Sequence, residues 1–230
     1  MKLSIVIPVF NNWNFTKACL NDLSELKDTE IVLVDNGSED ETIQINKEEL
    51  PSFTRPENLV VLRSEENLGF ARSSNWGCEV SSGEYVLFLN NDIRVQKDKS
   101  TWPSVLITEA QDGSLVGPNG GILDEHLNFI RETDKLVPGN FYMSGWCLCA
   151  KREVFDKLVL SENEYAGPFI EEFTTYFEDT DLSFRARELG IPMKIVPVPV
   201  FHFGKMTSKK IGLLGLYQAA KVKFINKWGK

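Results

Sequence analysis

The sequence predicts an α/β fold in which helices flank a mostly parallel central sheet. Apolar runs of strand length, the first at residues 3–9, alternate with segments of helical periodicity, the first at residues 14–26. The runs are apolar throughout, which is typical of strands buried on both faces of a parallel sheet. The 230 residues, 42% of them hydrophobic, suffice to bury one large core. We therefore expect a single domain, residues 1–230, with right-handed crossovers.

Residues 1–92 show the alternation most regularly. Strands are expected at residues 3–9, 30–35, 59–63 and 85–89, and helices at residues 14–26, 40–49 and 70–80. Ligands bind beyond the carboxyl ends of parallel strands, so the residues that follow these strands should meet at one edge. The polar residues and glycine in those positions are Asn11, Asp35, Asn67, Gly69 and Asp92.

Residues 93–204 are less regular. The pattern predicts helices at residues 100–111 and 178–189, and extended segments at residues 114–117, 141–150 and 193–200. From residue 201 to the end there are seven lysines, no acidic residue and a stripe of apolar residues at helical spacing. A basic amphipathic helix within residues 205–230 either rests on an anionic membrane surface or packs on the domain with its lysines in water.

Charge and cysteine content restrict the class of protein. The net charge of −8 argues against nonspecific nucleic-acid binding. No run of about 18 apolar residues is present, so we expect a cytoplasmic protein, with the C-terminal helix as a candidate contact with the cytoplasmic face of a membrane. The four cysteines lie in apolar or helical patterns, and Cys147 and Cys149 have the wrong spacing for a Cys-x-x-Cys site. We expect them to be reduced core residues.

Three polar segments in the first half are candidates for ligand binding. Asp92 follows the apolar run 85–89 closely, and it is either a metal ligand or a turn former. Asp35 is followed by Asn36 and Gly37, which indicates either hydrogen bonding to a pyrimidine or ribose, or a turn that caps the next helix. Residues 67–72 precede a helix whose first amides can face a phosphate, with Arg72 and Asn75 as further donors, or they form an ordinary loop.

Two features of the second half carry further candidates. Glu178, Asp179 and Asp181 begin a predicted helix, where they are either favourable charges on the helix dipole or a general base with its supports. The aromatic residues before them could desolvate one carboxylate and raise its pKa, while Arg185 steadies another. His202 is either a structural histidine or the nitrogen ligand that completes a metal site with Asp92.

Seven elements together resemble the inverting family 2 glycosyltransferases of the GT-A fold, particularly the rhamnosyltransferase-like branch. In chain order they are residues 6–11, 34–38, 67–71 and 89–92, then Ser144-Gly145 before residues 152–155, residues 178–185, and His202. Each element is weak alone, but all seven occur in the order of the family. The resemblance covers nearly the whole chain and divides it into a nucleotide-binding half, residues 1–92, an acceptor and catalytic half, residues 93–204, and the C-terminal helix.

The resemblance implies a role for each candidate residue. The nucleotide-sugar site would comprise Pro8, Phe10, Asn11, Asp35, Gly69, Arg72, Asn90 and Asn91. Asp92 would occupy the metal-binding DXD position and His202 the distal metal-ligand position. Asp179 would be the catalytic base, with Glu178 and Asp181 shaping its surroundings, and Ser144, Gly145 and Trp146 would line the acceptor site. Because Asn90 replaces the first acidic residue of the DXD element, we expect weaker or more selective metal binding.

The expected activity is inverting transfer of a sugar from a UDP- or dTDP-sugar to an acceptor hydroxyl, with Mn²⁺ or Mg²⁺ as cofactor. The acceptor would be a glycan, a lipid-linked sugar or a protein, in the assembly of cell-surface or secreted glycans. A sugar nucleotidylyltransferase is one alternative, although residues 11–14 lack the basic, glycine-rich loop that it requires. A noncatalytic module that binds nucleotide sugars or glycans is the other.

Overall fold

The computed structural model describes residues 2–47, 53–173, 176–204 and 214–229. The strands are β1 Leu3–Val9, β2 Thr29–Asn36, β3 Leu59–Ser64, β4 Tyr85–Leu89, β5 Ile93–Val95, β6 Leu115–Gly117, β7 Gly120–Leu123, β8 Phe129–Thr133, β9 Phe141–Met143, β10 Cys147–Lys151, β11 Met193–Ile195 and β12 Val200–His202. The helices are α1 Trp13–Leu23, the 3₁₀ helix η1 Glu41–Lys47, α2 Gly69–Val80, α3 Pro103–Glu109, α4 Arg152–Asp156, α5 Glu178–Glu188 and α6 Leu214–Trp228.

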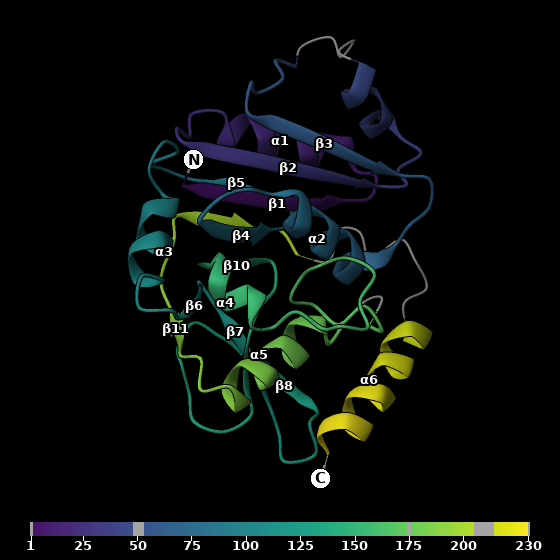
Figure 1. Ribbon diagram of the computed structural model, residues 1–230, viewed down its shortest axis with the longest axis vertical. Helices are drawn as coiled ribbons and strands as arrows, with labels where there is room; N and C mark the ends of the chain where they lie inside the picture. Colours follow the sequence, from purple (N-terminus) through teal and green to yellow (C-terminus); the bar gives the residue numbers. More distant parts are fainter. Residues whose placement is uncertain (1, 48–52, 174–175, 205–213, 230) are drawn as a thin grey trace.

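A seven-stranded sheet in the order β11-β6-β10-β4-β1-β2-β3 forms the centre of the protein (Figure 1). Its first-half strands β4, β1, β2 and β3 are parallel, as predicted, while β10 runs antiparallel to both β4 and β6. Alternate residues of a strand point to opposite faces. In β1, Ile5 and Ile7 therefore pack in the core with α1 and α3, whereas Val6 packs in the core with α2, α4 and α5. The predicted helix-flanked sheet is confirmed.

Two smaller sheets and the C-terminal helix complete the described fold. β5 pairs with β12 antiparallel, and β8, β7 and β9 form a three-stranded antiparallel sheet. α6 lies at the periphery near α5 and β8 (Figure 1), and its apolar residues share a third core cluster with Phe177 and Phe184. Packing on the domain, one of the two alternatives for this helix, is thus observed over residues 214–228. Residues 205–213 and 230 of the predicted C-terminal segment lie outside the described residues.

Two predicted elements differ from the structure. The helix expected at residues 40–49 is a 3₁₀ helix over Glu41–Lys47, and residues 48 and 49 lie outside the described residues. Of residues 41–45 only Thr42 and Ile45 are buried, which gives little packing to stabilise an α-helix. The extended segment expected at residues 141–150 is two strands in different sheets, separated by a turn at residues 144–146. All four cysteines are free and buried, as predicted. In the part of the chain that the structure describes, no helix has the length and apolar character needed to cross a membrane.

Candidate active site

Asp35 ends β2 at the edge predicted for ligand binding, and both of its carboxylate oxygens have partners. Oδ1 accepts a hydrogen bond from the Ser38 amide at 3.0 Å. This bond is the one expected if Asp35 forms a turn, the second of the two alternatives for this residue. Oδ2 pairs with Arg63, whose guanidinium also donates to the Ser38 carbonyl at 3.1 Å. Arg63 is the register neighbour of Asp35 on β3. Arg63 was not among the predicted site residues, and its only signal in the sequence was its place at the end of a predicted strand.

Asn11 links the end of β1 to the loop after β2. Its side-chain Oδ1 accepts hydrogen bonds from the amides of Glu39, at 2.8 Å, and Asp40, at 3.2 Å, and its own amide donates to Ser38 Oγ at 2.8 Å. Asn11 has φ of 56°, a left-handed conformation that asparagine tolerates better than most residues. Pro8 and Phe10, at the same end of β1, are partly exposed. The structure therefore brings Pro8, Phe10, Asn11 and Asp35 to one edge of the sheet.

The loop before α2 is held against the loop after β2. Asn36 Oδ1 accepts a hydrogen bond from the Leu68 amide at 2.7 Å, and Asn36 Nδ2 donates to Asn67 Oδ1 at 2.9 Å. Gly69 begins the helix with φ of 81°. Gly37 has φ of 76°, and a Cβ there would lie 2.7 Å from the Glu66 carbonyl carbon, so a side chain at this close approach would be strained.

The two predicted donors on α2 have partners within the protein. Arg72 forms an ion pair with Glu164 and lies 3.9 Å from Glu171. Asn75 is fully buried, donating to the Phe169 carbonyl at 2.7 Å and to Glu171 Oε1 at 3.1 Å, and accepting from the Phe169 amide at 3.0 Å. Asn75 has no group left for a phosphate, so that expectation is wrong. Arg72 is about one-third exposed and can exchange its partners.

Asp92 and His202 lie together although 110 residues separate them. Asp92 Oδ1 is 3.0 Å from His202 Nε2, and Asn90 Nδ2 is 3.3 Å from the same nitrogen. The pairing of β5 with β12 places His202 beside Ile93 and causes this meeting. The indole of Trp146 stacks on the imidazole, with ring centroids 4.5 Å apart.

Asn91 points away from this pair. Its side chain is buried and donates to Thr16 Oγ1 of α1 at 2.9 Å, at the bend between β4 and β5. Asp22, also on α1 and buried, accepts a hydrogen bond from the Val95 amide at 2.9 Å and pairs with Arg94. These contacts fix β5, and with it Asp92, on α1. The structure does not bring the Asn91 side chain together with Asp92 and His202.

The Asp92 and His202 side chains fit a divalent cation. Two adjacent ligands of an octahedral ion with bonds of about 2.1 Å lie about 3.0 Å apart, which matches the observed separation. Among the described residues there is no group of three or more histidines, cysteines, aspartates and glutamates that could hold a metal. In the described part of the chain, Asp92 and His202 would therefore be the two candidate ligands, and the other coordination positions would fall to a bound phosphate or to water.

Asp179 and Glu178 form a pair of carboxyl groups at the start of α5. The Gly145 amide donates to Asp179 Oδ2 at 2.9 Å, and Thr180 Oγ1 donates to Oδ1 at 3.2 Å. Burial raises the pKa of Asp179, and these hydrogen bonds oppose the rise. Burial, and then the charge of Asp179, raise the pKa of Glu178 to about 8. Glu178 Oε2 is buried and has no hydrogen-bond partner in the described part of the chain.

Asp181 is fully buried and belongs to an ion-pair network. Its carboxylate accepts from Arg185 Nε at 2.7 Å and Trp228 Nε1 at 2.8 Å, and Lys227 Nζ lies 2.8 Å away. The prediction that Arg185 steadies one carboxylate is confirmed for Asp181. Both oxygens of Asp181 have cationic or N–H partners, so its contribution to the site is to hold α5 in place.

The turn at residues 144–146 connects the Asp92–His202 pair to the carboxyl pair. Gly145 donates to Asp179, and a Cβ at Gly145 would lie 3.1 Å from the Asp179 Cβ, while Trp146 stacks on His202. Asn119 fixes the turn: its carbonyl accepts from the Ser144 amide at 3.2 Å and its Oδ1 accepts from Trp146 Nε1 at 2.7 Å. No motif or pattern in the sequence pointed to Asn119. The three predicted acceptor residues thus occupy one turn between the other two groups.

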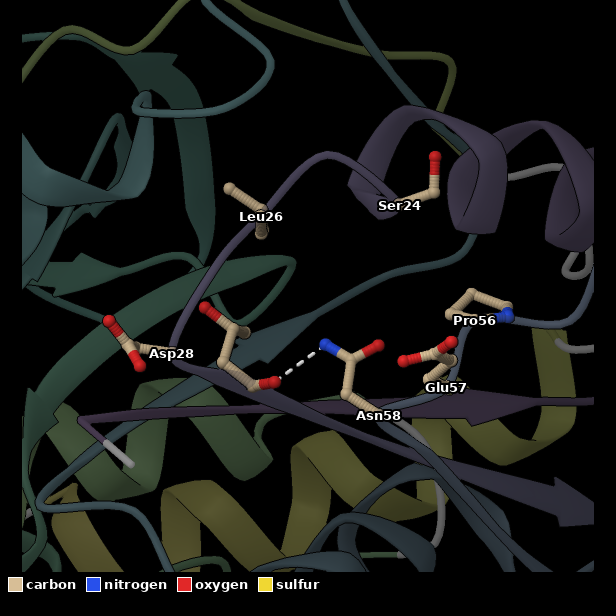
Figure 2. A pocket seen from close by; sticks show the side chains of 7 residues that line it. Ser24, Leu26, Asp28, Pro56, Glu57 and Asn58 are labelled. Carbon is tan, nitrogen blue, oxygen red and sulfur yellow. Dashed lines mark hydrogen bonds between the residues drawn. The ribbon is translucent and has the colours of Figure 1, made fainter.

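A pocket of about 490 Å³ lies at the opposite end of the sheet, away from these residues. Its lining comes from the segment after α1 and the segment before β3, and comprises Ser24, Leu26, Asp28, Thr29 and residues 56–58. The Asn58 side-chain amide donates to the Thr29 carbonyl (Figure 2). Thr29 and Leu59 are the first residues of their strands, so the pocket marks the amino ends of β2 and β3. The candidate active site is at the carboxyl ends.

The architecture is the GT-A fold of glycosyltransferases. TarS 1-349 from S. aureus in complex with UDP-GlcNAc aligns with a TM-score of 0.52 at 18% identity, over 81% of this chain and 53% of that chain. GalNAc-T7 with UDP, GalNAc and Mn²⁺ aligns with a TM-score of 0.65 at 17% identity, over 88% of this chain and 44% of that chain. At such low identities the likeness establishes the fold alone.

The chain belongs to glycosyl transferase family 2, whose family model matches residues 4–158. Glycosyltransferase GlyG of Streptococcus pneumoniae is 33% identical over 170 residues, which cover 72% of this chain and 50% of GlyG. Three other curated relatives are matched over 16%, 29% and 60% of their length. The chain thus spans only part of the relatives that it matches.

Proposed function

We propose that this chain is an inverting, metal-dependent glycosyltransferase that moves a sugar from a UDP- or dTDP-sugar to an acceptor hydroxyl. The observation that carries the proposal is the turn at residues 144–146, which contacts the partly buried Asp179 carboxylate on one side and the imidazole of His202 on the other. A donor held at Asp92 and His202 would therefore present its anomeric carbon close to a carboxylate that can act as base.

The donor would lie along the carboxyl edge of the parallel strands. Pro8, Phe10, Asn11 and Asp35 would surround the base and ribose, and the first amides of α2, from Gly69 onward, would face the diphosphate. Arg72 would exchange Glu164 and Glu171 for the diphosphate, whose negative charge is greater. Asn90 would contribute its amide beside His202, and Asn91 would contribute only by fixing the segment to Thr16.

A divalent cation bound by Asp92 and His202 would offset the negative charge that develops on the leaving nucleoside diphosphate. An imidazole ligand favours Mn²⁺ over Mg²⁺, because carboxylate, carbonyl and water are the ligands that suit Mg²⁺. The solved structure of GalNAc-T7 with UDP and Mn²⁺ is consistent with this choice.

Asp179 would act as the general base. It takes the proton of the acceptor hydroxyl while the acceptor oxygen bonds to the anomeric carbon, and the bond from that carbon to the phosphate oxygen breaks on the opposite face. One displacement of this kind inverts the configuration and requires one base. Glu178, with a pKa of about 8, keeps its proton at neutral pH, so Asp179 is the charged member of the pair.

The rhamnosyltransferase-like branch, a cytoplasmic location and a role in cell-surface or secreted glycan assembly stay predictions. A relative in S. aureus named poly(ribitol-phosphate) beta-N-acetylglucosaminyltransferase supports the last of these. For membrane contact the described part of α6 offers little free charge. Each of its three lysines is paired with a side chain of the domain. Lys221 hydrogen-bonds to Asn128, Lys223 pairs with Glu172 and Lys227 pairs with Asp181.

Nucleotide sugars and Mn²⁺ test the proposal directly. UDP-glucose, UDP-GlcNAc, dTDP-rhamnose and GDP-mannose are screened for thermal stabilisation, and the stabilising donors are then assayed for release of nucleoside diphosphate without acceptor. A bound donor raises the melting temperature by mass action, and slow hydrolysis that EDTA abolishes is expected. Binding with no hydrolysis of any donor would instead indicate a noncatalytic module, and release of pyrophosphate from a sugar phosphate and a nucleoside triphosphate would indicate a nucleotidylyltransferase.

A further inference from the structure

α6 contacts the helix that carries the candidate base at a buried charge. Asp181 is fully buried two residues after Asp179, and two of its three partners, Lys227 and Trp228, come from the last turn of α6. A buried carboxylate without partners is strongly destabilising, so these contacts hold α5 and α6 together. Arg185, the third partner, also donates to the Leu158 carbonyl at 2.7 Å, which fixes it independently of α6.

α6 also covers the backbone turn from which α5 begins. Tyr176 and Phe177 have φ of 71° and 70°, left-handed values that are strained for aromatic residues and persist only where surrounding contacts hold them. Two rings of α6 supply such contacts. Phe224 stacks on Phe177 with centroids 5.0 Å apart, and Tyr217 lies 5.4 Å from both Tyr176 and Phe177.

We propose that Lys227 and Trp228 are positioning residues for the catalytic base. They fix Asp181, and through it the first turn of α5, so that the Asp179 carboxylate stays in contact with the Gly145 amide. The inference rests on the proposed role of Asp179 as base. Glu178 and Asp179 lie on that same first turn, so a small rotation of α5 would move both carboxyl groups relative to the turn at residues 144–146.

A loss of position has a different kinetic effect from a loss of stability. Displacement of a base by about 1 Å can lower turnover by about 100-fold without affecting binding of a substrate that it does not contact. The Gly145 hydrogen bond lowers the pKa of Asp179. If α5 shifts and this bond is lost, the pKa of Asp179 rises, and the acidic limb of the kcat profile moves to higher pH.

The test removes the α6 donors while keeping the rings in place. Trp228→Phe loses the indole N–H but retains an aromatic ring beside Phe184, and Lys227→Met loses the charge. The double variant is assayed in Mn²⁺ with the nucleotide sugar that the wild-type chain hydrolyses fastest. We expect kcat to fall by about tenfold or more, the donor KM and the Kd for UDP with Mn²⁺ to stay within about twofold, and the acidic limb to move to higher pH.

Lys223→Met is the matched control, because Lys223 lies on the same helix but pairs with Glu172, outside α5. If kcat and the acidic limb of the double variant match those of this control, the positioning role is overturned. Trp228→Phe alone answers the question if the double variant melts below the assay temperature. Asp179→Asn in the same assay separates the two hypotheses. Unchanged turnover of Asp179→Asn would overturn the base assignment. Loss of turnover in Asp179→Asn, together with full activity of the double variant, would overturn only the positioning role.

Discussion

The proposed donor edge and the helix that carries the proposed base are positioned in different ways. At the donor edge, defined by the carboxyl ends of β1, β2 and β4, Asp35 lies beside its partner Arg63 on the neighbouring strand of a regular sheet. Asp179 is held by the Gly145 amide, 34 residues away, and its helix is held by Trp228, 47 residues from Asp181. Regular strand pairing therefore sets the donor edge, whereas long-range packing of irregular segments sets the base. The two should respond separately to mutation.

Asp179→Asn should have the largest effect and should leave the donor edge intact. The amide oxygen can still accept the Gly145 hydrogen bond, but an amide cannot take the proton of the acceptor. We expect kcat for donor hydrolysis to fall about 10³-fold, within the range typical of general bases. The Kd for UDP with Mn²⁺, measured by calorimetry, should stay within about twofold of the wild-type value.

Asp156→Asn is the control for this substitution, because Asp156 is exposed on α4 and the change in charge is the same. It should retain wild-type turnover. A parallel loss of UDP binding in Asp179→Asn would show that the base and the donor edge do not act separately.

Asp92→Ala and His202→Ala should affect the donor side instead. Each removes one of the two proposed metal ligands, so the affinity for Mn²⁺ in the presence of UDP should fall by at least 10- to 100-fold. Mutation of residues that only support a metal ligand already costs that much. Titration of Mn²⁺ followed by electron paramagnetic resonance measures this affinity. His126→Ala is the matched control, since the side chain of the other histidine is 77% exposed. Equal Mn²⁺ affinity in all three variants would remove Asp92 and His202 from the metal site.

The sequence predicted which residues meet at the carboxyl edge of the parallel strands, because local pattern decides the strands. Apolar runs fixed the four parallel strands, and the residue after each run necessarily lay at the shared edge. The Asp92–His202 pair was also predicted, from the ligand chemistry of the two side chains and then from the family resemblance, since no local pattern links residues 110 positions apart. The metal role itself stays a prediction.

The partners of individual side chains could not be read from the sequence. Arg72 and Asn75 fit the pattern of phosphate donors, yet the fold places residues 164–171 beside them and their hydrogen bonds are made there. Asp181 resembled a catalytic carboxylate, but the docking of α6 supplies two of its partners. Which polar group meets which depends on the packing of distant segments, and hydrophobic periodicity does not encode that choice.

Glu178→Gln should have the smallest effect and reports on burial of the carboxyl pair. With its pKa raised from 4.5 to about 8, folded Glu178 holds a proton that the unfolded chain has already lost. The free energy of unfolding therefore decreases as pH rises between those values. Glutamine does not titrate, so its own cost is the same at every pH. The melting temperature of Glu178→Gln relative to wild type should thus be higher at pH 9 than at pH 5, by at least about 2 °C for about 1 kcal/mol in a chain of this size.

Glu188→Gln removes one charge from the exposed last turn of the same helix and controls for net charge. If the relative melting temperatures of the two variants change equally with pH, Glu178 is not a buried acid, and the assignment of Asp179 as the charged member of the pair loses its support.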